Sequence, residues 1–298
     1  MKTKSVELFK LRQKEYIKYL ESFEKEKFTL ENWTRKEREG SYGGGGLSSS
    51  INGKILEKAG VNFSEVKGTL NPTMTNILIN QNKESLFFAT GVSLVIHPFS
   101  PYIPTTHANF RFLEVENFKW FGGGIDLTPY HYDPELFTLF HQSLKQVCDK
   151  YKVSFYSDFK NKCDKYFYLK YRKEHRGIGG LFFDYLGKNE DSLDLYYDFI
   201  SELSQDWSSI YGIFLDKYLN KEINEIDKKF QLHRRSRYVE FNLLHDRGTK
   251  FGLETGGRIE SIMMSMPPLA SWIEKYPYQN NENHSNLMKI IQKSKQWV

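Results

Sequence analysis

The sequence predicts a domain of mixed α and β structure, in which strands and helices occupy separate stretches of the 298-residue chain. Residues 85–96 and 107–116 are rich in β-branched and aromatic side chains, which favour strands. Residues 6–23 and 193–218 instead repeat their apolar side chains at helical spacing. No linker divides the chain, so we expect residues 1–298 to form a single domain.

An amphipathic surface helix is expected within residues 1–30. Its apolar positions lie near helical spacing, with charged residues between them: Val6, Phe9, Tyr16, Leu20 and Phe23. The glycines at 43–46 follow this helix and precede three serines. They lack the Lys-Ser/Thr ending of a phosphate-binding loop, so this segment is expected to be an ordinary loop.

The middle of the chain contains clear helix signals. Three prolines separate the two predicted strands: Pro98, Pro101 and Pro104. Asp133 and Pro134 are typical of a helix start, and the apolar stripe that follows includes His141, which we expect to be partly buried. The longer helix over 193–218 directs an apolar row inward: Leu195, Phe199, Leu203, Trp207, Ile210 and Phe214.

The C-terminal part predicts two further strands. Residues 237–245 alternate apolar and polar side chains, and residues 259–266 form a second β-rich stretch. Residues 246–250, Asp-Arg-Gly-Thr-Lys, have turn chemistry and predict a strand-turn-strand unit. Residues 279–298 form a polar tail with a short helix near its end.

Composition excludes several classes of protein. The hydrophobic fraction is 39% and the charged fraction 27%, as in ordinary globular proteins. No apolar run reaches the roughly 20 residues that span a bilayer, and the N-terminus lacks the pattern of a secretory or transit signal. We therefore expect a cytoplasmic protein without a membrane span, in which Cys148 and Cys163 are reduced and structural. The net charge of +5 is compatible with an acidic partner, either nucleic acid or a small polycarboxylate.

Two motifs have weak functional signals. His97 and His107 flank a proline-rich loop, but their ten-residue separation matches no compact zinc signature, so spacing alone favours structural histidines. The glycines at 122–124 lack the full dinucleotide fingerprint, which excludes a nicotinamide site there. They would instead let the backbone approach an aromatic side chain or a flat ligand, or form a tight turn.

The densest polar cluster lies between residues 234 and 260. It contains Arg234, Arg235, Arg237, Glu240, Asp246, Arg247, Lys250, Arg258 and Glu260. Arginines suit carboxylate ligands because their planar donors contact both oxygens, and a neighbouring aspartate can act as a base. A solvated charged turn with weak surface ion pairs explains the same residues equally well.

Several strings, in order along residues 33–272, resemble the oxygen-dependent coproporphyrinogen III oxidase family. They include EKAGVNFSEVKG, SLVIHP, PYIPTTHANFRF, WFGGGIDLTPY, RGIGGLFFD and RRSRYVEFNLLHDRGTKFGLETGGRIESIMMSMPPLA. The resemblance implies an α+β fold: a large antiparallel β-sheet flanked by α-helices on both faces, in a single domain. It also implies a homodimer that forms through roughly residues 238–273.

The implied reaction is the oxidative decarboxylation of two propionates of coproporphyrinogen III to vinyl groups, in haem biosynthesis. The product is protoporphyrinogen IX, molecular oxygen is the co-substrate, and no organic cofactor is used. Asp246 would engage the pyrrole N–H groups, Arg247 would hold the reacting propionate, and His107 would be the proton donor. Further positions match substrate-binding residues of the family: Ser93, Asn109, Phe110, Arg111, Gly256, Gly257 and Arg258.

Bacterial members of the family imply a divalent metal, bound here by His97, His107 and His141. At the fourth family position this chain has Tyr171 in place of a histidine. A protonated tyrosine is a poor metal ligand, so the substitution weakens the metal prediction and leaves a metal-free reaction open. The chain also departs from the family at Phe99, where an arginine is expected, and at Tyr185, where an aspartate is expected.

Three alternatives to this enzyme are open. A non-catalytic tetrapyrrole carrier or sensor of the same fold would bind the substrate without turnover. A basic nucleic-acid-binding module would show salt-sensitive affinity, although the chain has no known nucleic-acid motif. A histidine-metal hydrolase would need a bound metal and no oxygen. The resemblance favours the oxidase, with coproporphyrinogen III and a second copy of the chain as its partners.

Overall fold

The computed structural model describes residues 1–35, 43–254 and 257–298. Within these residues, seven strands form one antiparallel sheet in the order β1-β2-β3-β4-β5-β6-β9. The strands are β1 (Thr29–Arg35), β2 (Gly44–Ile51), β3 (Leu56–Leu70), β4 (Ser85–Pro98), β5 (Thr105–Val115), β6 (Phe118–Thr128) and β9 (Gly179–Leu186). The short strands β7 (Tyr168–Leu169) and β8 (Glu174–His175) form a separate pair.

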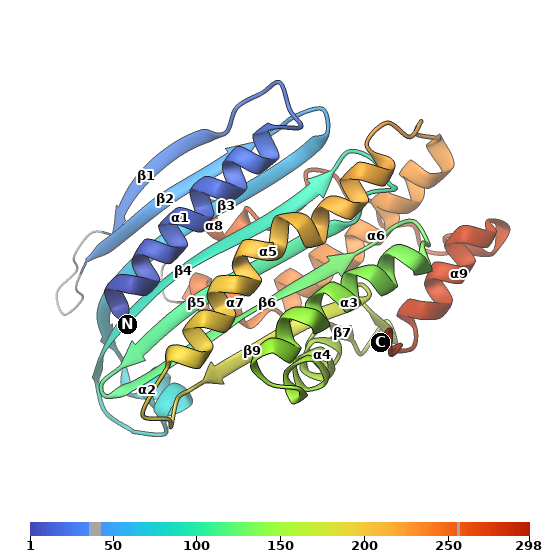
Figure 1. Ribbon diagram of the computed structural model, residues 1–298. Helices are drawn as coiled ribbons and strands as arrows, with labels where there is room; N and C mark the ends of the chain where they lie inside the picture. Colours follow the sequence, from blue (N-terminus) through green and yellow to red (C-terminus); the bar gives the residue numbers. More distant parts are fainter. Residues whose placement is uncertain (36–42, 255–256) are drawn as a thin grey trace.

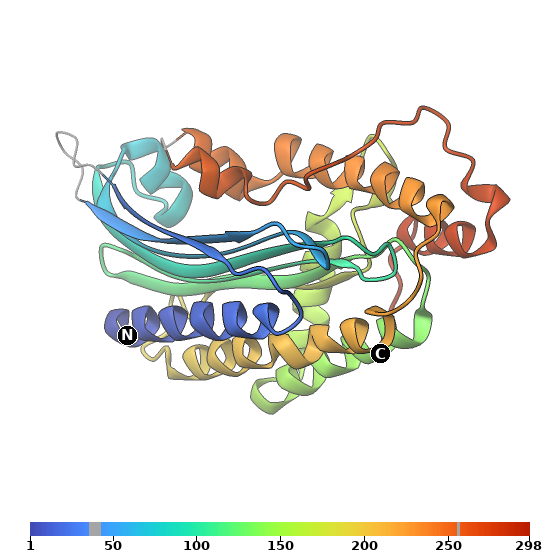
Figure 2. The same ribbon diagram turned by 90° about the horizontal axis from the view of Figure 1, so that it is seen from above.

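Helices cover both faces of the sheet (Figures 1 and 2). One face carries α1 (Lys2–Glu21), α3 (Pro134–Tyr151) and α5 (Asp194–Tyr218), while α4 (Ser154–Tyr166) runs past the β9 edge of the sheet towards the other face. The opposite face carries α2 (Pro72–Ile79), α6 (Glu225–Leu244), α7 (Arg247–Glu254) and α8 (Ile259–Met263). A 3-10 turn (Tyr278–Asn280) and α9 (Glu282–Ile291) follow. The predicted α+β fold with helices on both faces is thereby confirmed.

The main hydrophobic core lies between the sheet and the layer formed by α1, α3 and α5. Alternate residues of β4, Val92, Leu94 and Ile96, are almost completely buried there. From the helices, Phe9 and Trp207 pack into the same cluster. This follows from strand geometry, because every second side chain points to the same face. In the described residues, no helix is both long and apolar enough to cross a membrane.

Ion pairs attach α6 to β3 of the sheet and to the β7–β8 pair. The Arg234 guanidinium donates to Glu174 at 2.6 Å, and Arg235 donates to Glu57 at 2.7 Å and to the Pro98 carbonyl at 2.9 Å. Both arginines are essentially buried. A buried guanidinium requires such partners, because its desolvation would otherwise cost several kcal/mol. Arg234 and Arg235 of the polar cluster are thus structural.

The two strands predicted at 237–245 and 259–266 are wrong. The first stretch belongs to α6, and the second contains α8 and the turn after it. Asp246 does not start a hairpin turn; it immediately precedes α7. The helical period of α6 was hidden because its buried positions include arginines as well as Phe230 and Phe241. Counted as polar, these arginines break the apolar period of the helix.

The loop predicted at the glycines 43–46 is also wrong from Gly44 onward, where β2 begins. Gly46 pairs with Trp33 of β1 and Ser64 of β3. A Cβ atom on Gly46 would lie 2.1 Å from the Phe63 carbonyl oxygen and 2.8 Å from the Trp33 ring. The glycine is therefore explained by close packing within a strand.

Most other predicted elements are confirmed. They are the N-terminal helix, the strands over 85–96 and 107–116, the helix that starts after Asp133, the helix over 193–218 and the short helix in the C-terminal tail. The side chain of Asp133 caps its helix by accepting the Leu136 N–H. His141 is completely buried, more so than expected. The glycines at 122–124 lie within β6 and form no tight turn.

Candidate active site

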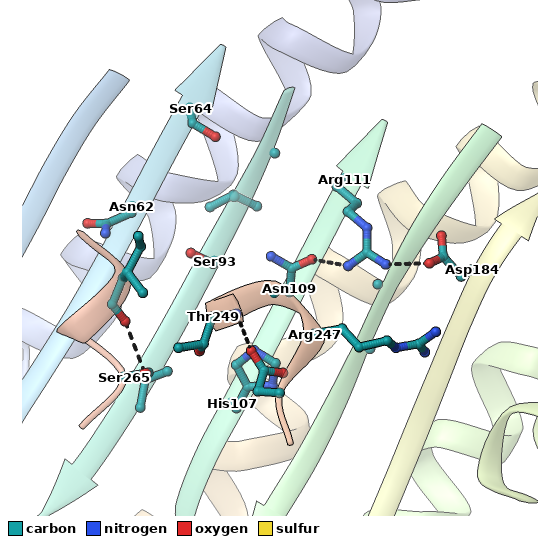
Figure 3. A pocket seen from close by; sticks show the side chains of 18 of the residues that line it. Asn62, Ser64, Ser93, His107, Asn109, Arg111, Asp184, Arg247, Thr249 and Ser265 are labelled. Atoms are coloured by element: carbon teal, nitrogen blue, oxygen red, sulfur yellow. Dashed lines mark hydrogen bonds and ion pairs between the residues drawn. The ribbon is translucent and has the colours of Figure 1, made fainter. Parts of the chain in front are cut away.

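A cavity of about 790 Å³ lies between the sheet and the α6–α8 layer. Its volume falls within the usual range of small-molecule sites. The floor is formed by alternate side chains of β3 to β6, and the walls come from α2, the end of α4, the end of β9 and the α6–α8 segments. Figure 3 shows polar side chains from several strands converging on this space: Asn62, Ser64, Ser93, His107, Asn109 and Arg111.

A buried charge cluster forms one part of the floor. Asp126 of β6 accepts a hydrogen bond from His107 Nδ1 of β5 at 2.9 Å, and its second oxygen pairs with Arg176. The Arg176 guanidinium lies 4.0 Å from the Phe167 ring centre and 4.4 Å from that of Tyr238. Burial alone would raise the pKa of Asp126, but Arg176 and His107 together hold this pKa below its usual value. Asp126 is therefore an anion at neutral pH.

The Asp126 interaction also fixes the tautomer of His107. Because the carboxylate can only accept, Nδ1 must carry the proton in this bond. Nε2 is then the nitrogen that can serve the cavity, which His107 lines with a 29% exposed side chain. The pair resembles in geometry the carboxylate-oriented histidines that act as acids or bases.

Arg111 of β5 lies at another part of the floor. Its guanidinium donates to Asn109 Oδ1 at 3.0 Å and to Asp184 Oδ2 at 2.9 Å, as Figure 3 shows. A Cβ atom on Gly122 would lie 2.6 Å from Asp184 Oδ1 and 2.8 Å from Arg111 Nε. Glycine at this position therefore leaves room for the Arg111–Asp184 pair.

The junction of α6 and α7 lies over the same floor. Asp246 Oδ2 accepts the backbone N–H of Thr249 at 2.6 Å, which caps the start of α7. Its Oδ1 accepts the Tyr166 hydroxyl at 2.8 Å. Arg247 has an exposed side chain that lines the cavity, with its guanidinium 5.0 Å from the Tyr166 ring centre. In Figure 3, Arg247, Thr249 and His107 lie on the same side of the sheet.

Only some of the predicted substrate-binding residues line the cavity. Ser93, Asn109 and Arg111 line the cavity, and so does Arg258, which pairs with Glu31 at 2.5 Å. The side chain of Phe110 is buried in the core on the other face of the sheet. Gly257 donates its backbone N–H to the Gly252 carbonyl at 2.7 Å. Gly256 lies outside the described residues.

The three predicted metal ligands do not surround one point. His97 uses both ring nitrogens, with Thr105 Oγ1 at 3.1 Å and the Ser265 carbonyl at 2.9 Å. His141 belongs to α3 on the opposite face of the sheet and is bonded to the Ile178 carbonyl and the Tyr156 hydroxyl. Among the described residues, no group of three or more His, Cys, Asp or Glu side chains is arranged to hold a metal ion. These residues do not fit a metal site within one chain.

The three family departures lie at different places. Tyr171 is half exposed and stacks on His245, with ring centres 5.4 Å apart. Tyr185 lines the cavity and stacks on Trp120 at 5.3 Å. Phe99 is on the surface beneath the Lys228 ammonium group, outside the cavity lining.

The polar residues of the site that were missed from the sequence include Asp126, Arg176 and Tyr166. Asp126 and Arg176 occur in the strings WFGGGIDLTPY and RGIGGLFFD, where each is a charged residue next to an apolar stretch. That contrast was the available signal, because a charged side chain that is buried among apolar residues requires a partner. Tyr166 carries no comparable signal, because its helix contains a second tyrosine and three lysines.

The site suits an organic ligand that carries several carboxylates and N–H groups. Guanidinium groups of Arg111, Arg247 and Arg258 can bind carboxylates at the rim. The carboxylates of Asp126 and Asp246 can accept hydrogen bonds from N–H donors. Apolar and aromatic wall residues can contact a ring system: Trp33, Met74, Leu78, Leu113, Trp120 and Phe182.

Comparison with known proteins agrees with this chemistry. The family model described as coproporphyrinogen III oxidase matches residues 4–297. The chain is 43% identical to the oxygen-dependent coproporphyrinogen-III oxidase of Prochlorococcus marinus, over 99% of this chain and 92% of that protein. It is 42% identical to the oxidase of the same name from Drosophila melanogaster, over 96% of this chain and 75% of that protein.

A third relative, from Rickettsia rickettsii, has the same name. It is 46% identical to this chain over 81% of this chain and 84% of the relative. Such identity over most of both chains, together with the full-length family match, goes far beyond a shared fold. The chain belongs to the coproporphyrinogen III oxidase family.

Proposed function

We propose that this chain is an oxidoreductase that converts coproporphyrinogen III to protoporphyrinogen IX in haem biosynthesis, with molecular oxygen as electron acceptor. One observation carries the proposal: a single cavity of about 790 Å³ combines the Asp126 and Asp246 carboxylates with the guanidinium groups of Arg111, Arg247 and Arg258. The three relatives are all named as oxygen-dependent coproporphyrinogen-III oxidases.

Each turnover removes the carboxylate of one propionate. The C–C bond to the carboxylate breaks and carbon dioxide leaves, while the carbon next to the pyrrole loses a proton and an electron pair overall. Oxygen takes the two electrons and two protons to give hydrogen peroxide. The sum for each side chain is propionate, oxygen and one proton going to vinyl, carbon dioxide and hydrogen peroxide.

The residues divide this work by their chemistry. Arg247 and Arg111 hold propionates, because paired N–H donors match carboxylate geometry. Asp246 accepts the pyrrole N–H groups, which makes the ring richer in electrons and easier to oxidise. In its doubly protonated form, His107 is oriented by Asp126 at Nδ1 and supplies a proton through Nε2. Ser93, Asn109 and Arg258 complete the contacts with the rim of the substrate, and Gly256 and Gly257 stay predicted substrate-binding positions.

No step of this reaction is assigned to a metal. His97 and His141 lie on different faces of the sheet and use their ring nitrogens in other hydrogen bonds. The side chains that line the cavity are sufficient to bind the substrate and to move protons. Oxygen is the co-substrate, and no organic cofactor takes part.

We also propose that residues 1–298 act as one domain and that two copies form a homodimer through roughly residues 238–273. Large apolar side chains are exposed along that segment: Leu243, Leu244, Leu253, Leu269 and Trp272. Such exposure supports an interface between proteins. Sedimentation should give twice the monomer mass, and Leu269→Glu should lower that mass; a monomeric parent protein would contradict the proposal.

A cytoplasmic location is part of the same proposal. It is supported by Cys148 and Cys163, which are both free and buried. Free thiols are typical of reducing compartments. Fractionation of cells that express the chain tests the location.

The activity is tested by incubating the purified protein with coproporphyrinogen III in air and under nitrogen. Samples are then oxidised, and protoporphyrin is followed by its fluorescence. We expect product in air, two carbon dioxide molecules for each product molecule, and no product under nitrogen. A protein that binds the substrate in air without turnover would instead be the carrier or sensor.

A further inference from the structure

Tyr166, the last residue of α4, connects three segments that meet above the cavity. Its ring lies parallel to Phe182 of β9, with centres 4.4 Å apart and an angle of 8°. The edge of the same ring packs on Phe241 of α6 at 5.5 Å. Two aromatic neighbours from different elements thus fix the ring, and with it the direction of the hydroxyl.

The Tyr166 hydroxyl bridges two consecutive residues of the α6–α7 junction. It donates to Asp246 Oδ1 at 2.8 Å and accepts the backbone N–H of Arg247 at 3.0 Å. Burial, reinforced by the Asp246 carboxylate, raises the pKa of Tyr166 to about 12. The hydroxyl therefore keeps its proton at neutral pH and remains the donor in the Asp246 bond.

This bridge controls the orientation of both junction residues. With Thr249 N–H on Oδ2 at 2.6 Å, the Asp246 carboxylate is held at both oxygens, so its plane cannot rotate freely. Arg247 is held by its backbone N–H, and its guanidinium lies 5.0 Å from the Tyr166 ring centre and 5.8 Å from that of Phe182. One side chain therefore orients the carboxylate and the guanidinium that face the cavity.

We propose that Tyr166 is a positioning residue for the decarboxylation, acting through Asp246 and Arg247. The inference rests on the proposed function and adds a residue that sequence patterns did not indicate. A misplaced catalytic group slows the chemical step more than it weakens binding, because alignment matters most in the transition state. Loss of the hydroxyl should therefore lower kcat and leave KM nearly unchanged.

The chain provides a matched control for this test. Tyr218, at the end of α5, donates its hydroxyl to Asp133 Oδ2 at 2.6 Å. Asp133 caps α3, as Asp246 caps α7, but on the opposite face of the sheet. Tyr218→Phe thus removes the same kind of tyrosine–aspartate bond without touching the cavity.

The test compares Tyr166→Phe and Tyr218→Phe with the parent protein in the aerobic assay. We expect Tyr166→Phe to lower kcat on the order of tenfold or more with KM changed by less than about threefold. Tyr218→Phe should keep the parent kcat. Equal kcat values for all three proteins would overturn the inference while leaving the proposed function intact, whereas an inactive parent protein would refute the function itself.

A double-mutant cycle separates positioning from a general structural effect. In an Asp246→Ala background, which removes the acceptor of the Tyr166 hydroxyl, adding Tyr166→Phe should change the single-turnover rate by less than about twofold if Tyr166 acts mainly through Asp246. Multiplicative losses in the double variant would contradict that route. Thermal melts of Tyr166→Phe and Tyr218→Phe should be similar, so a selective collapse of Tyr166→Phe would also count against the inference.

Discussion

The two faces of the sheet are built from the same strands but serve different purposes. Towards α1, α3 and α5, the strands present Val92, Leu94, Ile96 and similar residues to a continuous apolar core. Towards α6–α8, they present Ser93, His107, Asn109 and Arg111 to a cavity. The first layer is held by apolar packing, whereas α6 on the second face is attached by buried ion pairs.

This difference shows how one sheet can combine a stable core with a reactive surface. Neighbouring residues of a strand, such as Ser93 and Leu94, point to opposite faces. Substitutions at adjacent positions should therefore have different consequences. Changes on the apolar face should reduce stability, and changes on the cavity face should reduce activity.

The largest expected effect is on the cavity face, at Asp246. Asp246→Ala should lower kcat on the order of a hundredfold or more, because it removes a carboxylate that accepts substrate N–H groups. It also removes the α7 cap, which should cost about 1 kcal/mol of unfolding free energy. Aerobic kinetics and a urea titration measure both. Global unfolding of the variant would make Asp246 a structural residue and break the comparison.

The next test uses adjacent residues of β4. Leu94→Ala should cost about 2–5 kcal/mol of unfolding free energy, because Leu94 is fully buried and the substitution leaves a cavity in the core. The kcat of its folded fraction should stay close to that of the parent. Ser93→Ala should instead raise KM and change stability by less than about 0.5 kcal/mol. If both variants affected the same property, the separation of the two faces would be wrong.

Acid should weaken the attachment of α6. His284 of α9 donates to Asp227 near the start of α6 at 2.7 Å. Burial would raise the pKa of Asp227, but bonds from His284, Tyr102 and Asn224 lower it to about 2. This folded-state value lies below the unfolded one, so the stabilisation is present above about pH 4 and is lost as the pH falls towards 2.

The expected loss is on the order of 1–2 kcal/mol, allowing for solvent screening at the partly accessible carboxylate. Denaturant titrations between pH 2 and pH 7 measure it in the parent protein. Asp227→Asn should show a smaller decrease over the same interval. An identical decrease in both proteins would assign the acid sensitivity to other groups.

The smallest expected effect concerns metal removal. Because His97 and His141 bond to the Ser265 and Ile178 carbonyls at separate places, we expect turnover after dialysis against a chelator to remain within about twofold of the untreated protein. Elemental analysis of the same samples checks the metal content. Stoichiometric metal together with chelator-sensitive turnover would contradict this expectation. It would show that the metal ligands are not those that a single chain brings together.

Much of the fold could be predicted from local patterns. The apolar periods of α1 and α5 and the cap at Asp133 are visible in the sequence because they depend on near neighbours. The helix α6 could not be recognised, because its buried Arg234 and Arg235 depend on Glu174 and Glu57, which are distant in the chain. Gly46 of β2 likewise leaves room for Trp33 and Phe63 on adjacent strands, which cannot be foreseen from its sequence neighbours.

The candidate site shows the same limit. Arg111, Asp246 and Arg247 were indicated by strings that resemble the family, and all three line the cavity. The pairing of Asp126 with Arg176 joins residues 50 positions apart through tertiary contacts, so no local pattern reveals it. Phe110 was predicted to bind substrate because its position matches the family. Strand alternation instead turns its side chain to the other face of the sheet, where it is buried.

The most direct test of the two-face account is hydrogen–deuterium exchange with coproporphyrin III, the oxidised form of the substrate with the same four propionates. Binding should slow exchange in peptides that cover residues 164–176 and 240–250, which border the cavity. Exchange in α1 and α5, on the apolar face, should not change. Protection confined to α1 and α5, or no protection anywhere despite measured binding, would contradict the assignment of the cavity face as the active one.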